Sequence, residues 1–153
     1  MERFKLIAVV YMMLIKDNKI LLSLRKNTGY ADGQYGLVSG HLDGNEPATM
    51  GLAREVKEEI GVDVRPEDMT LKVTMHGYDP GREAMDLFFM ADRWSGEIRN
   101  MEPEKCGDLS FFPLNLLPDN TVPYVRDAIM SALKGVSYLE DGWDMCSQNK
   151  ATL

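Results

Sequence analysis

Three glutamates, Glu55, Glu58 and Glu59, have a spacing that suits the binding of a metal ion. They stand at positions i, i+3 and i+4, which places their carboxylates on one side of any helix that contains them. Such a group of oxygen ligands suits a hard divalent cation such as Mg²⁺, which keeps several waters that a phosphate can replace. An ordinary solvated helix face has the same composition, so the three glutamates alone leave both interpretations open.

The segment that carries these glutamates has the period of an amphipathic helix. Leu52, Val56 and Ile60 recur every four positions, and Gly61 follows them. This pattern predicts a helix over 46–60 that ends at the glycine. Its apolar side is expected to be buried, which leaves the carboxylates on the opposite, polar side.

A longer pattern surrounds the three glutamates. Gly40 is followed after five residues by Glu46 and, after seven more, by the run Arg54-Glu55-Val56-Lys57-Glu58-Glu59-Ile60-Gly61-Val62. At ordinary residue frequencies this match has a chance of about one in a billion at any one start. The run is similar to a complete Nudix box, and the chain resembles the Nudix hydrolases, in particular MutT-like members, from about residue 4 to 133.

The resemblance implies a fold and a set of roles. The expected architecture is α/β, an α/β/α sandwich with a mixed curved sheet. In the family, the residues that match Glu55, Glu58 and Glu59 bind metal or activate water, Gly40 gives its carbonyl, and Glu46 is an orienting carboxylate. Arg54 is expected to hold Glu46 or Glu55 in place rather than to contact substrate.

The resemblance also implies an activity. MutT-like enzymes cleave a nucleoside triphosphate to a nucleoside monophosphate and pyrophosphate, usually by attack of water on the β phosphorus. Mg²⁺ or Mn²⁺ neutralises the phosphate oxygens, and Glu55 is the first candidate to accept the proton of the water. Oxidised guanine nucleotides are one candidate substrate. Nucleotide sugars, ADP-ribose and dinucleoside polyphosphates are alternatives, because the box recognises only the metal and the diphosphate. A ligand sensor without catalysis is disfavoured, because every box carboxylate is present.

Three residues outside the box are candidates for the same site. Glu104 is the predicted further metal ligand, with Glu102 in reserve, unless this segment is a solvated acidic loop. Arg25 ends the second predicted strand, where family members place a phosphate-contacting base, although a plain surface arginine is also compatible. Asn120, shortly after Pro118, matches an asparagine that meets the base edge in MutT-type enzymes. It could equally be a helix N-cap.

The rest of the sequence predicts one domain over 1–134 and a tail over 135–153 that could pack on it. A second helix is expected at 122–133, where apolar residues again recur four apart. Two strands are predicted at 4–15 and 20–24, joined by a turn at Asp17-Asn18. Further strands or short apolar pieces are predicted at 35–38, 71–76, 84–94 and 109–114. Residues 39–45 are predicted to be a loop.

Composition limits the partners. The chain of 153 residues has a formal net charge of −7, which does not attract a long nucleic acid, whereas a small nucleotide bound with a cation remains compatible. Cys106 and Cys146 are too few for a disulfide framework, so a reducing, cytoplasmic compartment is expected. No segment has the length of a membrane span. The oligomeric state, monomer or homodimer, is left open.

Overall fold

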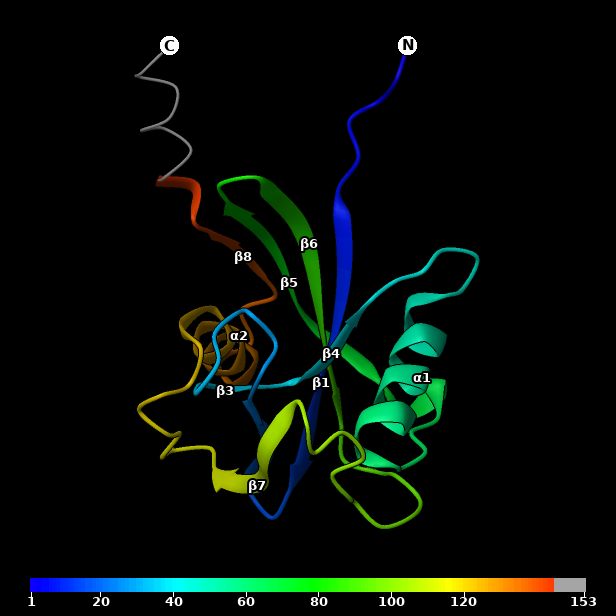
Figure 1. The fold of residues 1–153 in the computed structure, drawn as a ribbon, viewed down its shortest axis with the longest axis vertical. Helices are drawn as coiled ribbons and strands as arrows, with labels where there is room; N and C mark the ends of the chain where they lie inside the picture. Colours follow the sequence, from blue (N-terminus) through cyan, green and yellow to red (C-terminus); the bar gives the residue numbers. More distant parts are fainter. Residues whose placement is uncertain (145–153) are drawn as a thin grey trace.

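A mixed sheet forms the centre of the protein in the computed structural model, which describes residues 1–144 (Figure 1). Eight strands in these residues follow the order β3-β2-β1-β6-β5-β8, with β4 paired to β1 and β7 paired to β2. The elements are β1 (Ile7–Lys16), β2 (Lys19–Arg25), β3 (Tyr35–Gly36), β4 (Val38–His41), α1 (Ala48–Ile60), a 3-10 turn (Pro66–Asp68), β5 (Thr70–Asp79), β6 (Arg82–Ala91), β7 (Cys106–Pro113), α2 (Pro123–Lys134) and β8 (Tyr138–Asp141).

The sheet is mixed because β1 pairs in parallel with β6 and β5 in parallel with β8, whereas the other pairs are antiparallel. The predicted hairpin between β1 and β2 is confirmed. Its two-residue turn consists of Asp17 and Asn18, whose φ angles of 52° and 58° match a turn that follows the twist of the strands. Strand β1 begins at Ile7 rather than at residue 4, and Phe4 is exposed.

Alternate residues of β1 serve two separate cores, one on each face of the sheet. Tyr11 and Met13 pack with Ile129 of α2, and Met12 packs with Val56 of α1. Figure 1 shows the two helices on opposite sides of β1. The predicted α/β/α sandwich with a mixed sheet is therefore confirmed.

Helix α1 begins later than the sequence pattern predicts. Pro47 is the N-cap, with an extended backbone (φ −62°, ψ 148°), so the helix starts at Ala48 rather than at 46. A residue before proline is disfavoured in the α conformation, which keeps Glu46 in the preceding loop. The predicted end is confirmed, because Gly61 adopts φ 76° and its N–H donates to the Lys57 carbonyl.

Two elements were not expected from the pattern. Residues 39–41, predicted to begin a loop, form β4 together with Val38, because this segment pairs with β1 across Val10 and Gly40. The segment 138–141 has no clear period, yet it adds β8 to the edge of the sheet beside β5. Trp143 then donates from Nε1 to the His76 carbonyl at 2.9 Å. Residues 138–141 and Trp143 thus contact strand β5, and residues 145–153, with Cys146, lie outside the described residues.

Within residues 1–144, no helix is both long and apolar enough to cross a membrane.

Candidate active site

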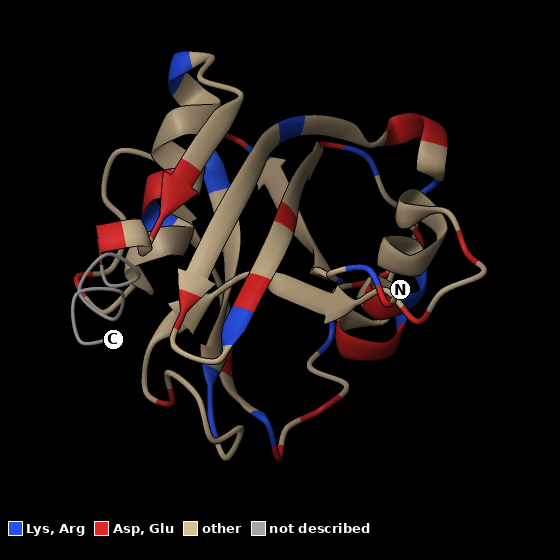
Figure 2. Cartoon of the chain, turned by 90° about the horizontal axis from the view of Figure 1, so that it is seen from above, with Lys and Arg blue, Asp and Glu red and all other residues tan. Residues whose placement is uncertain are grey.

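Strand β4 and helix α1 position the carboxylates of the box. The apolar side of α1, with Leu52, Val56 and Ile60, is buried against the sheet. Glu58 is exposed, whereas Glu55 and Glu59 flank the apolar side and reach strand β4. Figure 2 shows acidic residues on α1 and on the segment that leads into it. The predicted separation of core and carboxylates therefore holds for Glu58, whereas Glu55 and Glu59 lie at the border between the helix and the sheet.

Gly40 and Glu55 are packed directly against one another. A Cβ atom at position 40 would lie 2.1 Å from Cδ and 2.3 Å from Oε1 of Glu55. Real Cβ atoms do not approach other atoms this closely, so only glycine leaves room for the carboxylate. The structure therefore gives a steric reason for the glycine of the box.

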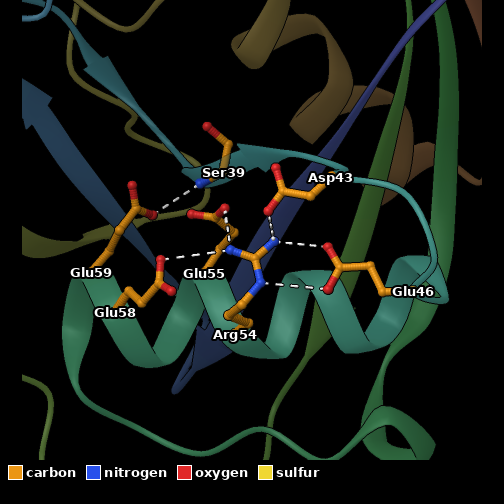
Figure 3. A network of polar contacts seen from close by, with 7 residues as sticks. All are labelled: Ser39, Asp43, Glu46, Arg54, Glu55, Glu58 and Glu59. Atoms are coloured by element: carbon orange, nitrogen blue, oxygen red, sulfur yellow. Dashed lines mark hydrogen bonds and ion pairs between the residues drawn. The ribbon is translucent and has the colours of Figure 1, made fainter.

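Arg54 links the carboxylates into one network (Figure 3). Its Nη2 donates to Glu46 Oε1 at 2.8 Å and its Nε to Glu46 Oε2 at 3.4 Å, while Nη1 donates to Glu55 Oε1 at 2.9 Å. Asp43 and Glu58 are further ion-pair partners, at 3.2 and 3.7 Å. The hydrogen bond from Arg54 lowers the pKa of Glu46. Arg54 thus has the geometry of a residue that holds Glu46 and Glu55.

Glu59 points toward β4, where its Oε2 accepts a hydrogen bond from the Ser39 N–H at 3.2 Å. The pKa of Glu59 is raised to about 8, chiefly by burial and to a smaller extent by the negative charges of Glu55 and Glu102. Burial also raises the pKa of Glu55, against the effect of Arg54. A bound cation would favour the ionised form of carboxylates that are crowded in this way over the protonated form.

A cavity of about 650 Å³ opens beside Glu59, whereas Glu55 and Glu58 do not line it. Gly40, Glu59 and Glu102 line it, together with the cationic side chains of Arg25 and Lys105. Arg25 ends β2 as predicted and is held by its neighbours, since Nε donates to the Tyr30 carbonyl at 2.7 Å. Carboxylates for a cation and cations for a phosphate therefore meet around one cavity.

The structure brings Glu102 to the cavity rather than Glu104. Glu104 is exposed, does not line the cavity, and its backbone carbonyl accepts a hydrogen bond from Asn27 Nδ2 at 3.2 Å. Residues 102–105 form a turn, in which the Lys105 N–H donates to the Glu102 carbonyl at 2.9 Å. This turn separates the side chain of Glu102 from that of Glu104. The reserve candidate thus lies with the helix carboxylates, whereas the first candidate does not.

Asn120 does not line this cavity, and its Nδ2 donates to the Gly33 carbonyl at 3.0 Å. The suggestion that it caps the second helix is wrong, because that helix begins at Pro123 after Val122 as N-cap. Pro123 fixes a helical φ and has no N–H, so it starts the helix without a polar cap. This arrangement favours a structural role for Asn120, and the predicted contact with a base is left to experiment.

Sequence reasoning missed two residues of the network. Asp43 reaches Arg54 from the loop before α1, and no pattern marks it. Gly51 sits inside α1, where an added Cβ would lie 2.8 Å from Glu46 Oε1. A glycine inside a helix costs about 1 kcal/mol relative to alanine, so its position was a usable signal for a close contact.

The donors at this site fit Mg²⁺ in type, because all of them are oxygens. Glu59 has no Lys, Arg or His partner within 4 Å among residues 1–144. In the same residues, no three His, Cys, Asp or Glu side chains are gathered closely enough to form a ready-made metal site. The crowding of Glu55 and Glu59 nevertheless supplies a reason for a cation to bind there.

A mixed sheet between two helices, with a glutamate-bearing helix packed under a glycine of the sheet, is typical of the Nudix class of hydrolases. The family model described as NUDIX domain matches residues 5–132. The chain belongs to the NUDIX family, which confirms the relationship predicted from the box. A MutT NUDIX hydrolase from Burkholderia pseudomallei has a similar structure, with 28% identity and a TM-score of 0.76 over 83% of this chain and 98% of that one.

Three curated relatives carry different activities in their names. An ADP-ribose pyrophosphatase of Methanocaldococcus jannaschii is 32% identical over 67% of this chain and 59% of that protein. An NAD-capped RNA hydrolase NudC of Stutzerimonas stutzeri is 32% identical over 63% of this chain and 33% of that protein. An 8-oxo-dGTP diphosphatase of Proteus vulgaris is 30% identical over 64% of this chain and 86% of that protein. The chain therefore spans less than two thirds of the first two relatives.

Proposed function

We propose that this protein is a divalent-metal-dependent pyrophosphohydrolase that cleaves a nucleoside triphosphate to a nucleoside monophosphate and pyrophosphate. One observation carries the proposal: Glu59 and Glu102 share a cavity with Arg25 and Lys105. Carboxylates for a cation and basic side chains for phosphate oxygens are the two sets of groups that this reaction needs.

Each residue of the box has a part in this proposal. Glu55, Glu58 and Glu59 would hold Mg²⁺ or Mn²⁺, which supplies positive charge to the phosphate oxygens when it is bound. Arg54 keeps Glu55 in position through its bond to Oε1. Oε2 of Glu55 is the atom that we assign to accept the proton of the attacking water, because Arg54 binds Oε1 and thereby orients the carboxylate.

The substrate has two candidate classes. Similarity to the 8-oxo-dGTP diphosphatase favours a nucleoside triphosphate, with oxidised guanine nucleotides among them. Similarity to the ADP-ribose pyrophosphatase favours a nucleoside diphosphate joined to another group. The box carboxylates serve either class, because both contain the same diphosphate unit. The partner is a small nucleotide in either case.

Product analysis separates the two classes. The protein is incubated with Mg²⁺ and a panel of canonical and oxidised nucleoside triphosphates, nucleotide sugars and ADP-ribose in water enriched in ¹⁸O. We expect a nucleoside triphosphate to give monophosphate and pyrophosphate, with the label in the pyrophosphate because water attacks the β phosphorus. Preferred turnover of ADP-ribose to AMP and ribose phosphate would support the second class, and label in the monophosphate would place the attack at the α phosphorus.

A further inference from the structure

A chain of hydrogen bonds lies at the cavity away from the box helix. Tyr11 of β1 and Tyr124 of α2 both line the cavity, and their hydroxyl oxygens are 3.1 Å apart. The Tyr11 hydroxyl also donates to Oδ1 of Asp86, on β6, at 3.4 Å. Three elements that are far apart in the sequence thus contribute one polar group each to a single chain.

The direction of these hydrogen bonds follows from the number of protons. Asp86 is only 3% exposed, and burial raises the pKa of its carboxyl, against the effects of Arg82 Nη2, 3.9 Å from Oδ1, and of the Tyr11 hydroxyl. The ionised carboxylate can only accept a hydrogen bond. Tyr11 has one proton and donates it to Asp86, so its oxygen accepts from Tyr124. The proton of Tyr124 is then used as well, and what its oxygen offers to a ligand is an acceptor.

The surroundings of Tyr124 suit the base of a nucleotide. Tyr30 lines the same cavity, and the Arg25 guanidinium lies 5.6 Å from the centre of its ring. Aromatic rings can contact the flat face of a base, whereas Arg25 and Lys105 suit the phosphates. One cavity therefore contains a charged part, an aromatic part and, at Tyr124, an acceptor whose orientation is fixed by Tyr11.

We infer that the Tyr124–Tyr11–Asp86 chain is a base-recognition subsite that selects nucleotides whose base carries an exocyclic amino group. The amino group would donate to the Tyr124 oxygen. A base without that group leaves the oxygen of this part-buried hydroxyl without a donor, which costs binding free energy. This inference rests on the proposed function for its ligand, a nucleotide, and adds which feature of the base is read.

Binding without hydrolysis tests the inference. The full chain is titrated, in a chelator, with two pairs of nucleotides that each differ by one amino group: AMP against purine riboside 5′-monophosphate, and GMP against IMP. We expect the wild-type protein to bind the amino member of at least one pair about tenfold more tightly. Tyr124→Phe should bind both members of that pair equally, at the affinity of the weaker one. A melting curve checks that the variant is folded.

Two further variants separate an oriented chain from a lone hydroxyl. Tyr11→Phe keeps the Tyr124 hydroxyl but frees its proton to donate, so the preference should fall to about twofold or less. Tyr138→Phe removes an exposed hydroxyl of β8 that donates to Glu140 and should leave the preference unchanged. Since Tyr11 is buried, Tyr11→Phe is compared only if it melts in one cooperative transition. Asp86→Asn provides a second test, because its amide can donate to Tyr11, and the preference should fall in the same way.

Several results would overturn the inference. The wild-type protein could show no preference in either pair, or bind none of the four nucleotides at millimolar concentration. Tyr124→Phe could keep the full preference. Tyr124→Phe could also keep the preference for the amino group and instead lose a preference between ribose and 2′-deoxyribose nucleotides. Hydrolysis of the panel is measured separately. An intact amino preference in a protein that hydrolyses nothing contradicts the proposed function alone, and hydrolysis without the preference contradicts this inference alone.

Discussion

The carboxyl group of Glu55 lies directly against the α-carbon of Gly40, in the space where any other residue would place its Cβ atom. Gly40→Ala should therefore displace Glu55 and lower kcat by about a hundredfold or more, with the fold retained. The measurement is kcat together with the melting temperature. Gly107→Ala is the matched control, because an added Cβ there meets its nearest neighbour, Leu24 Cδ2, at an ordinary 3.5 Å. Equal activity of the two variants would contradict the role given to this contact.

Arg54 is predicted to act by positioning. Arg54→Lys keeps the positive charge but loses the two-point hydrogen bonding to Glu46 and the bond to Glu55, so kcat should fall about ten- to a hundredfold. The melting temperature should change little, because Arg54 and its partners lie outside the core. Lys57→Ala, on the exposed part of the same helix, serves as control. A variant as active as that control would show that the charge of Arg54 suffices.

Glu102 and Glu104 give opposite expectations although they are two residues apart. Glu102→Gln should lower kcat about tenfold or more, since Glu102 lines the same cavity as Glu59 and adds to the rise in the pKa of Glu59. Glu104→Gln should leave kcat within about twofold, since its side chain is exposed. The activity of both variants is measured as the metal concentration is raised. A larger loss of kcat in Glu104→Gln than in Glu102→Gln would support Glu104 as the metal ligand.

The pKa of Glu59 predicts how the metal-free protein responds to pH. Its folded-state pKa of about 8 is raised from an ordinary value near 4.5, so the folded protein binds an additional proton between these limits. In a chelator, the free energy of unfolding should therefore decrease as pH rises toward and through 8. Between pH 6 and 9 the wild-type protein should lose about 2–3 kcal/mol more than Glu59→Gln, which cannot ionise. Urea unfolding at both pH values measures this, and parallel changes would refute the shift.

Asn120 links two segments of the structure rather than capping α2. Asn120→Ala removes the hydrogen bond to the Gly33 carbonyl and should lower the free energy of unfolding by about 1 kcal/mol. The order of substrate preference should stay the same, because the side chain does not line the cavity. Melting temperature and kcat/KM on two nucleotides test both statements. A changed order of preference would establish the base contact that the family pattern suggests.

The parts of the site that the sequence predicts are those set by local periodicity. Glu55, Glu58 and Glu59 share a helix with the apolar residues that bury it, so one period fixes both sides. Arg54 follows from the same helix and the preceding loop. The family resemblance supplied the architecture, while the pattern alone gave only the elements.

The errors fall where distant segments or single turns decide the outcome. Strand β4 is polar and forms only because it pairs with β1, and β8 is four residues long and is defined by β5. The choice between Glu102 and Glu104 depends on one turn, in which the Glu102 N–H donates to the side chain of Asn100 at 3.2 Å. Sequence spacing does not determine which side chain such a turn directs to the cavity.

The dependence of turnover on a divalent cation and on the α1 carboxylates tests the central claim most directly. Initial rates on the preferred nucleotide are measured with Mg²⁺, with chelator, and with Mg²⁺ restored, for the wild-type protein, Glu58→Gln and Glu59→Gln. We predict that the chelator abolishes turnover reversibly while circular dichroism is unchanged, and that each variant loses at least about a hundredfold in kcat. Turnover that persists in the chelator, or near-normal rates in both variants, would contradict the assignment of this site.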